Sequence, residues 1–205
     1  MRAYNYSDIS LIPEKSVLTH RADADVSIQF LGWTFRLPVI PANMEAVISP
    51  DVAWTLSERG YFYIMHRFGD TRAFVHRANE QIWRVISISV GVQEEDRRII
   101  DYICVKGLRV DFVTIDIAHG HSNQTKEFIQ YIRKCLPDAK IIAGNVATNA
   151  AVYDLSVWGA NAAKVGIAGG SVCSTKNQTG FHVPMWTCVK DCVSQHPTRS
   201  PIPII

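Results

Sequence analysis

Residues 111–146, DFVTIDIAHGHSNQTKEFIQYIRKCLPDAKIIAGNV, decide the fold. An almost continuously apolar run reaches Asp116, a stretch with helical spacing follows at 123–137, and a second apolar run occupies 140–146. Continuous apolar runs are typical of parallel strands that are buried on both faces, whereas half-exposed strands alternate apolar and polar residues. The stretch therefore predicts a strand, a crossover helix and a second parallel strand.

The same unit recurs along the chain. Six apolar runs are predicted to be strands, and a helix-like segment follows each of the first five. The runs are 37–44, 61–68, 85–92, 111–120, 140–146 and 162–168, and PIPII at 201–205 is predicted to open a seventh strand. Ser49 and Thr148 are expected to cap the helices that they precede, and Pro50 suits a first helical turn. Regular alternation in one domain predicts a doubly wound sheet or a (β/α)8 barrel.

Polar residues at the ends of the predicted strands favour the barrel. They are Asn43, His66–Arg67, Asp116, His119, Asn145 and Cys173. Barrel enzymes carry their active sites at this end, on the loops that follow the strands, and no early G-x-G-x-x-G turn supports the doubly wound alternative. A complete barrel needs about 250 residues. We therefore expect one domain over 1–205, an incomplete (β/α)8 barrel that stops within strand seven, with a hairpin around Gly32 at its bottom.

Composition argues against several classes of protein. The 205 residues are 47% hydrophobic and 20% charged, and the formal net charge of +2 indicates no surface for nucleic acid or membranes. No apolar run is long enough for a membrane span, and MRAYNYSDIS at 1–10 lacks the apolar core of a secretory signal. Five cysteines without paired C-x-x-C spacing argue against a disulfide framework or a zinc site and favour a cytoplasmic setting. Cys188 and Cys192 are expected to pack on one helix face.

Seven segments resemble, in the same order, GMP reductases of the bacterial type, which share a superfamily with IMP dehydrogenases. The segments are YSDISLIPEKS (6–16), LPVIPANM (37–44), YFYIMHRF (61–68), SISVGV (87–92), TIDIAHGHSN (114–123), AGNVAT (143–148) and KVGIAGGSVCSTKNQTGF (164–181). The resemblance covers 4–205. It implies a (β/α)8 barrel, NADPH-dependent reductive deamination of GMP to IMP and ammonia, and a homo-oligomer, usually a tetramer.

The resemblance also assigns roles on the substrate side. Cys173 matches the nucleophile that attacks purine C2 and forms a covalent thioimidate, which divides one difficult substitution into easier steps. Thr175 matches a threonine that helps to activate the leaving or attacking group. Met44 matches a methionine that packs on the purine, and Ser171 a serine that contacts the phosphate.

On the cofactor side, the resemblance gives Asp116 the part of the acid that holds the nicotinamide ribose hydroxyls. Arg67, Asn145 and Lys164 are assigned to the same side of the site. NADPH is the implied hydride donor.

The loop before the cysteine departs from the family pattern, because Ala168-Gly169-Gly170 stands where the family carries Gly-Pro-Gly. The resemblance suggests a monovalent cation such as K+ on the backbone carbonyls of Ala168, Gly170 and Cys173. Alanine is strained where a positive φ is needed, and losing proline raises the entropy of the unfolded loop. Both changes therefore argue against this cation site and against a pre-organised loop.

Two other kinds of chemistry are conceivable on the same residues. His119 and His121, with Asp116 nearby, suggest a metal site, but a third ligand is unassigned. Lys164 on a barrel strand suggests Schiff-base chemistry, which leaves the cysteine loop unexplained.

Two alternatives concern the reaction as a whole. IMP dehydrogenase oxidises IMP with NAD+ through the same cysteine, yet most members carry a regulatory insert after the second barrel unit, and about 20 residues link the corresponding segments here. A non-catalytic remnant is the other alternative. The family's next segments, rich in Asp-Gly-Gly and Gly-Ser, and a later glutamate do not follow residue 205. We therefore expect little or no turnover from this chain alone.

Overall fold

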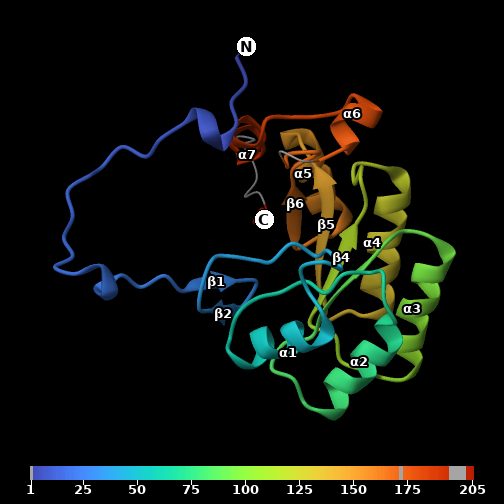
Figure 1. Cartoon of the computed structure of the whole chain (residues 1–205). Coiled ribbons are helices and arrows are strands. Elements are labelled where there is room, and N and C mark those ends of the chain that lie inside the picture. Colours follow the sequence, from blue (N-terminus) through green and yellow to red (C-terminus); the bar gives the residue numbers. More distant parts are fainter. Residues whose placement is uncertain (1, 171–172, 194–201) are drawn as a thin grey trace.

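Four parallel strands in sequence order form the sheet at the centre of the molecule (Figure 1). They are β3 (Ser87–Val90), β4 (Phe112–Asp116), β5 (Lys140–Val146) and β6 (Ala162–Val165). The structure is a computed structural model, and it describes residues 2–170, 173–193 and 202–205, without the side chain of Thr175. Every residue of β3 is buried, as the continuous apolar runs predict for strands covered on both faces.

Helices alternate with these strands and form a layer on one side of the sheet, in which α2, α3, α4, α5 and α7 contact one another in turn. The α-helices are α1 (Pro50–Glu58), α2 (Thr71–Glu80), α3 (Glu94–Val105), α4 (Asn123–Cys135), α5 (Asn149–Trp158), α6 (Thr175–Thr179) and α7 (Met185–Val193), with short 3-10 turns at Tyr6–Asp8 and Arg21–Asp23. No helix in this described part has the length and apolar character needed to span a bilayer.

Local sequence signals set the helix ends. The Ser49 hydroxyl accepts the Val52 N–H at 3.3 Å, and the Thr148 hydroxyl accepts the Ala151 N–H at 3.2 Å, so both predicted caps are confirmed. Along α4, residues Phe128, Ile129 and Ile132 are fully buried, which packs this helix onto the sheet.

The first two predicted strands are not strands in the described structure. Segment 61–66 lies beside β3, but Met65 N–H to Ser87 O, at 3.2 Å, is the one backbone bond recorded between them. Segment 37–44 makes no ladder with a neighbour among the described residues, and Val39 is 63% exposed. An apolar run becomes a strand only when a neighbour supplies repeated backbone bonds, and this condition is not visible in the run itself.

The predicted hairpin is confirmed, and it covers the amino ends of the strands. Its strands are β1 (Ile28–Phe30) and β2 (Trp33–Phe35), joined by Leu31 and Gly32 with φ of 50° and 90°. Positive φ at both turn positions matches the right-handed twist of paired strands. Phe35 packs on Phe62 with ring centroids 5.0 Å apart, and Phe62 packs on Phe112 at the start of β4.

The C-terminal residues add a further parallel segment beside β6. Ala163 N–H donates to Pro203 O at 2.9 Å, Ile205 N–H donates to Ala163 O at 2.9 Å, and Val165 N–H donates to Ile205 O at 2.8 Å. The predicted start of a seventh strand is therefore confirmed, and the fold is a partial barrel of parallel strands. Within α7, the thiols of Cys188 and Cys192 are fully buried, in agreement with a packing role.

Candidate active site

A polar cleft of about 250 Å³ lies at the carboxyl ends of β4, β5 and β6. Its walls are formed by Arg67, Asp116, Ile117, Ala118, Asn145, Lys164, Gly166, Ile167 and Ala168. Parallel α/β folds bind ligands at this end of the sheet because the loops that follow the strands converge there. The structure thus brings together all four residues predicted for the cofactor side.

Lys164 joins two strand ends inside the cleft. Its Nζ lies 2.8 Å from Asp116 Oδ1 and 2.8 Å from Asn43 Oδ1. The side chains of Lys164 and Asp116 are each only 22% exposed, so the pair is screened by water much less than a surface ion pair. Lys164 therefore fixes the position of the Asp116 carboxylate.

Asn43 is the member of this group to which neither the motifs nor the resemblance assign a role. It is buried, and its Nδ2 has no hydrogen-bond partner among the residues the structure describes. The signal in the sequence is a polar residue at the end of a predicted strand. Its partner Lys164 is 121 positions further along the chain, so the contact follows from the fold alone.

The two other cofactor-side residues, Asn145 and Arg67, differ in burial. The half-buried Asn145 donates its Nδ2 to Gly166 O at 2.9 Å, which ties the end of β5 to the loop after β6. Arg67 is exposed, and its guanidinium lies 4.6 Å from the centroid of the Phe68 ring. Arg67 therefore offers a positive charge at the solvent side of the cleft.

Two glycines let the strand ends approach closely behind the cleft. A Cβ added at Gly144 would lie 2.4 Å from Lys164 O, and one added at Gly120 would lie 2.8 Å from the backbone carbon of Gly144. Both contacts are with backbone atoms, which cannot move aside as a flexible side chain can. A larger residue at Gly144 would push β5 away from Lys164 on β6, and one at Gly120 would push its loop away from β5.

The loop after β6 leads from the cleft to Cys173. Ala168 has a φ of 54°, so the alanine does stand where a positive φ is required. This conformation costs a residue with a Cβ about 1–2 kcal/mol. Cys173 is half-buried, and its N–H donates to Gly170 O at 3.1 Å. Thr175 is the first residue of α6.

Met44 and Cys173, which are predicted on the substrate side, are not part of the cleft wall. Met44 is 57% exposed and is not among the described residues that line the cleft. Ser171 lies outside the described residues. Cys173 follows the cleft wall by five positions but does not itself belong to the lining.

Two of the three carbonyl groups suggested for a cation have hydrogen-bonding partners. Ala168 O lies 3.1 Å from His182 Nδ1, and Gly170 O accepts the Cys173 N–H. His182 is exposed, and no local signal in the sequence predicts its contact with the loop.

The two histidines after β4 do not converge on a metal. His121 Nε2 lies 2.8 Å from Asp154 Oδ2 on α5, and its ring packs against Trp158. Over the described ranges, no group of three or more His, Cys, Asp or Glu side chains could hold a metal ion. His121 therefore links the loop to α5 and not to Asp116.

Comparison with known proteins identifies relatives over nearly the whole chain. The sequence model of the family described as "IMP dehydrogenase / GMP reductase domain" matches residues 3–205. A protein named GMP reductase from Oenococcus oeni is 45% identical over 203 residues, which are 98% of this chain and 63% of that protein. One of the same name from Helicobacter pylori is 46% identical over 188 residues, 91% of this chain and 58% of that protein.

A solved structure gives the same result at the level of the fold. Inosine 5′-monophosphate dehydrogenase from Legionella pneumophila superposes with a TM-score of 0.79 at 33% identity, over 93% of this chain and 59% of that one. This confirms the partial barrel. The chain spans about three fifths of the length of these relatives, which is 58–63% for the two GMP reductases. With residues 3–205 matched, the chain belongs to the IMP dehydrogenase / GMP reductase family.

Proposed function

We propose that residues 1–205 form one domain that carries the cofactor cleft and the reactive cysteine of a GMP reductase, which converts GMP to IMP and ammonia with NADPH. The observation that carries the proposal is the cleft in which Lys164 holds Asp116 beside Asn145 and Arg67, one loop before Cys173. Relatives that are 45% and 46% identical bear the name GMP reductase, which favours this reaction over the oxidation of IMP.

The cleft suits the nicotinamide ribose end of NADPH. Lys164 donates to one oxygen of the Asp116 carboxylate. In this proposal the other oxygen accepts a ribose hydroxyl. At about 250 Å³, the cleft is smaller than a pocket for a whole drug-sized ligand, so it can hold only part of a dinucleotide. Arg67 at the solvent side can contribute positive charge toward phosphate groups.

Cys173 is the proposed nucleophile toward the purine. Its thiolate attacks C2 of GMP, and the C2 amino group takes up a proton and leaves as ammonia, which leaves a thioimidate on sulfur. NADPH, when bound, supplies the hydride that C2 receives. The C–S bond then breaks, IMP is released and the Cys173 thiolate returns. In balance, GMP, NADPH and two protons give IMP, NADP+ and ammonium.

Four finer assignments stay predictions within this proposal. They are Thr175 as the helper of the leaving or attacking group, Met44 against the purine, Ser171 against the phosphate, and a monovalent cation on the carbonyls of Ala168, Gly170 and Cys173. A homotetramer belongs with them. Each follows from the family resemblance.

A labelling experiment tests the role of Cys173 without requiring turnover. The probe is 2-chloroinosine 5′-monophosphate, whose chloride leaves when a thiolate attacks C2. We expect peptide mapping to find the adduct on Cys173, GMP to slow the labelling, and Cys173→Ala to abolish it. Cys104, an exposed thiol on α3, is the internal control for non-specific reaction. Labelling of Cys104 as fast as Cys173, or no protection by GMP, would contradict the proposal.

Cofactor binding is tested separately by fluorescence titration with NADPH and with NADH. Asp116→Ala is expected to weaken NADPH binding about tenfold or more, because a buried, charge-assisted hydrogen bond contributes about 1.5–3 kcal/mol. Asp138→Ala, on the loop between α4 and β5, is the control and should leave binding unchanged. Equal affinities for Asp116→Ala and the unaltered chain would remove Asp116 from the proposed site.

A further inference from the structure

Two of the cysteines meet across the contact between α3 and α4. Cys104 is the next-to-last residue of α3, and Cys135 is the last residue of α4. Their thiols interact directly, and neither is part of a disulfide. Cys104 is exposed and Cys135 is half-buried, so solvent reaches one thiol freely and the other only in part. The reaction proposed above uses neither of them.

The packing of the two helices holds these thiols opposite each other. Each helix presents three residues at helical spacing on one face. They are Arg97, Asp101 and Cys104 on α3, and Phe128, Tyr131 and Cys135 on α4. The Arg97 guanidinium lies 4.7 Å from the centroid of the Tyr131 ring, the Tyr131 hydroxyl donates to Asp101 Oδ1, and the cysteines form the last layer. Successive contacts along both helices thus fix the register in which the thiols face each other.

The position of the pair suits a disulfide. A disulfide needs Cα atoms about 4.4–6.8 Å apart, and cysteine side chains are too short for their thiols to touch across a much wider gap. Both cysteines lie in the last turn of their helix, where the final carbonyl groups have no partner within the helix and the backbone moves more easily. The two sulfur atoms can therefore approach to the bond length of about 2.05 Å without a change in the sheet.

The surroundings give the two thiols different roles. Burial is the largest cause of a raised pKa at the Cys135 thiol, and the Tyr131 hydroxyl offsets part of the rise. Cys135 therefore keeps its proton at neutral pH and reacts slowly with a dissolved oxidant, because the thiolate is the reactive form. Cys104 is exposed at the surface of α3 and meets the oxidant first.

We propose that Cys104 and Cys135 form an oxidation-sensitive dithiol, which closes reversibly to a disulfide between α3 and α4 when a peroxide reaches Cys104. The Cys104 thiolate attacks hydrogen peroxide, the O–O bond breaks, hydroxide leaves and Cys104 becomes a sulfenic acid. The Cys135 sulfur then attacks the Cys104 sulfur and gives up its proton, and the S–O bond breaks to release water. In balance, two thiols and one peroxide give one disulfide and two molecules of water. The sulfur atoms lose two electrons, and the peroxide gains them.

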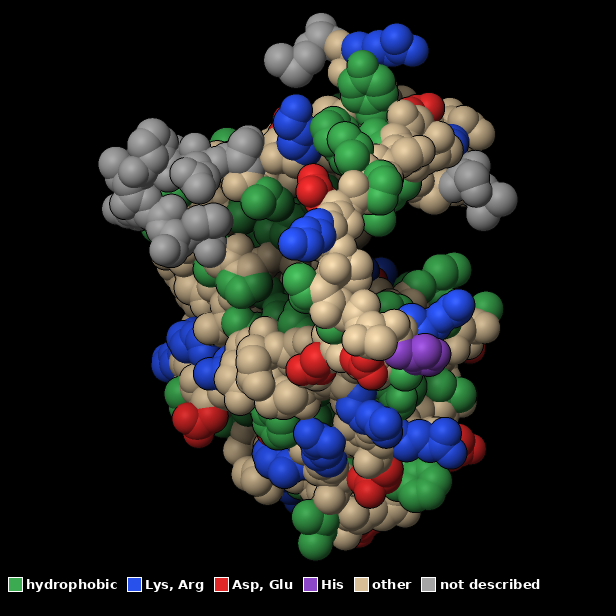
Figure 2. All heavy atoms as spheres, turned by 90° about the vertical axis from the view of Figure 1, so that its left-hand side faces the viewer, with side chains coloured by type: hydrophobic (Ala, Val, Ile, Leu, Met, Phe, Trp, Pro, Cys, Tyr) green, Lys and Arg blue, Asp and Glu red, His purple; other side chains and the backbone are tan. Residues whose placement is uncertain are grey.

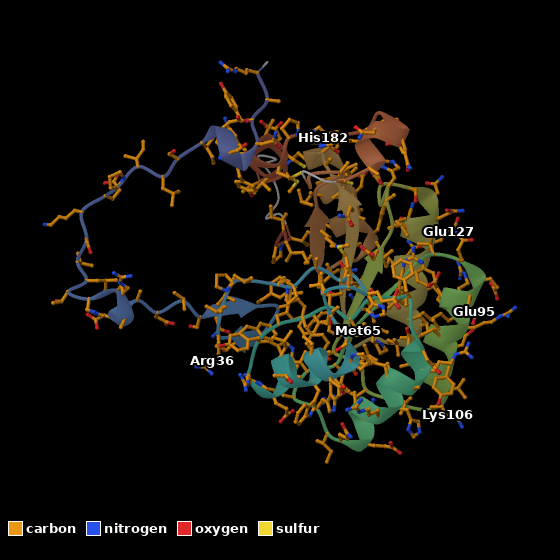
Figure 3. The ribbon with its side chains drawn as sticks, in the orientation of Figure 1. Arg36, Met65, Glu95, Lys106, Glu127 and His182 are labelled. Atoms are coloured by element: carbon orange, nitrogen blue, oxygen red, sulfur yellow. The ribbon has the colours of Figure 1, made fainter. Side chains whose placement is uncertain are left out.

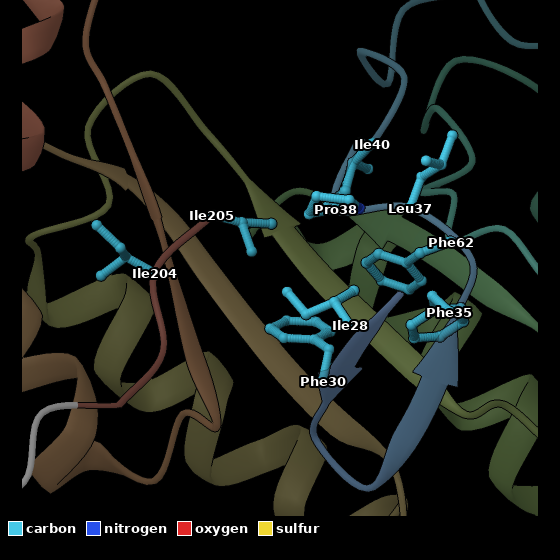
Figure 4. A pocket seen from close by; sticks show the side chains of 9 residues that line it. All are labelled: Ile28, Phe30, Phe35, Leu37, Pro38, Ile40, Phe62, Ile204 and Ile205. Carbon is cyan, nitrogen blue, oxygen red and sulfur yellow. The ribbon is translucent and has the colours of Figure 1, made fainter. Parts of the chain in front are cut away.

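This modification site is separate from the cleft and from the apolar surface of the molecule. In Figure 3, Lys106 marks the end of α3 near Cys104, and it lies at the opposite end of the molecule from His182, which contacts the loop before Cys173. Figure 2 shows the side away from the helices, where hydrophobic side chains are recessed between more polar surfaces. An apolar groove of about 310 Å³ on that side (Figure 4) has no cysteine among the described residues that line it. The inference therefore does not depend on the proposed function.

The test oxidises the reduced whole chain with hydrogen peroxide and maps the thiols by mass spectrometry without reduction. We expect the intact mass to fall by about 2 Da, since two hydrogen atoms are lost. Tryptic peptides 99–106 and 135–140 should be cross-linked, and dithiothreitol should reverse both changes. The disulfide closes a loop of about 30 residues, so the midpoint of thermal unfolding should rise by about 5–10 °C on oxidation.

Matched variants separate the two steps. In Cys135→Ser the Cys104 sulfenic acid has no thiol partner, so trapping with dimedone should label Cys104 about tenfold more than in the unaltered chain. Cys104→Ser should remove the cross-link and leave Cys135 with little dimedone label. Cys188 and Cys192 are the internal control, because their thiols also interact but are fully buried. They should stay reduced under the same treatment.

Three outcomes would overturn the proposal. One is no cross-link between peptides 99–106 and 135–140, whatever other oxidation products of Cys104 appear. Another is a cross-link whose yield falls as the chain is diluted, because the bond would then join two molecules. The third is an equal yield in urea, where the unfolded chain no longer holds α3 and α4 in register.

Discussion

The Lys164 ammonium group has two oxygen partners, and its side chain is largely shielded from solvent. The Asp116 carboxylate and the Asn43 amide oxygen each lie 2.8 Å from its Nζ. The three residues come from separate segments of the chain, so the ammonium group ties the end of β6 to the end of β4 and to the segment before α1. This contact makes Lys164 a positioning residue for the proposed cofactor site.

A double-mutant cycle measures the interaction energy between Lys164 and Asp116. Lys164→Met and Asp116→Asn should show a coupling energy of about 1–3 kcal/mol in urea unfolding, because both side chains are largely removed from water. The control cycle is Arg77→Met with Asp51→Asn, a pair at 3.0 Å whose side chains are 44% and 81% exposed. That coupling should be about 0–1 kcal/mol. Equal couplings in the two cycles would show that the cleft does not strengthen the Lys164 pair.

The backbone conformation of Ala168 leads to a second prediction at the residue scale. Its φ of 54° is unfavourable for a side chain with a Cβ and costs glycine little. Ala168→Gly should raise the free energy of unfolding by about 0.5–1 kcal/mol, once the greater unfolded-state entropy of glycine is subtracted. Ala150→Gly, at an exposed site in α5, is the matched control and should lower it by about 0.5–1 kcal/mol. The same sign at both sites would refute the strain argument.

At the scale of elements, segment 61–66 is held beside β3 mainly by side chains. The buried Tyr63 hydroxyl donates to Val85 O at 2.9 Å, and the Ser89 hydroxyl donates to Met65 O. These bonds replace the backbone ladder that a regular strand would have. The segment therefore keeps its place in the barrel without the repeated pattern that defines a strand.

Tyr63→Phe should lower the free energy of unfolding by about 1–2 kcal/mol at pH 7, because Val85 O loses a buried donor. Burial raises the pKa of the Tyr63 hydroxyl well above its ordinary value. Above about pH 10, the unfolded phenol loses its proton while the folded one keeps it, so this contribution to stability falls as the pH rises. The difference between the two chains should therefore narrow above that pH.

Urea unfolding from pH 7 to pH 11 checks this prediction. Tyr6→Phe is the control, because Tyr6 is 57% exposed and its loss should change stability by about 0.5 kcal/mol or less. A difference between Tyr63→Phe and the unaltered chain that grows above pH 10 would contradict the assigned sign.

At the scale of the whole molecule, the N-terminal arm (residues 9–27) and the rest of the chain are held by different kinds of contact. The side-chain bonds recorded within 9–27 are local ones, such as Ala22 N–H to His20 Nδ1. In contrast, Tyr4 at the root of the arm exchanges two bonds with Thr187 of α7. Few tertiary contacts mean that the arm can open without unfolding the sheet.

Brief trypsin digestion should therefore cut after Lys15 and Arg21 at least about tenfold faster than after Arg133, because cleavage in the body requires its unfolding. Arg133 in α4 is the internal control, since its guanidinium donates to three backbone carbonyls. Mass spectrometry of early digests identifies the fragments. Early cleavage after Arg133 at the rate of the arm sites would show that the body is no more protected than the arm.

The residues by themselves determined the class of fold and the family. Buried parallel strands need continuous apolar runs and helices need caps, so 111–146 already indicated the repeating unit. The sequence also predicts that the polar residues at the strand ends lie close together, because the carboxyl ends of parallel strands meet at one edge of the sheet. Asp116 and Asn145 are therefore expected in one cleft from the sequence alone, and the family resemblance adds Lys164 to them.

Only the tertiary structure decided which of these residues touch and which apolar runs become strands. The bond from Lys164 to Asn43 joins positions 121 residues apart, and no local pattern encodes such a distance. Segment 37–44 has the composition of a strand, yet it forms no ladder among the described residues, because backbone pairing requires a neighbour. The residues of a segment set its local propensity, whereas strand pairing, side-chain contacts and the shape of a groove depend on how the whole chain folds.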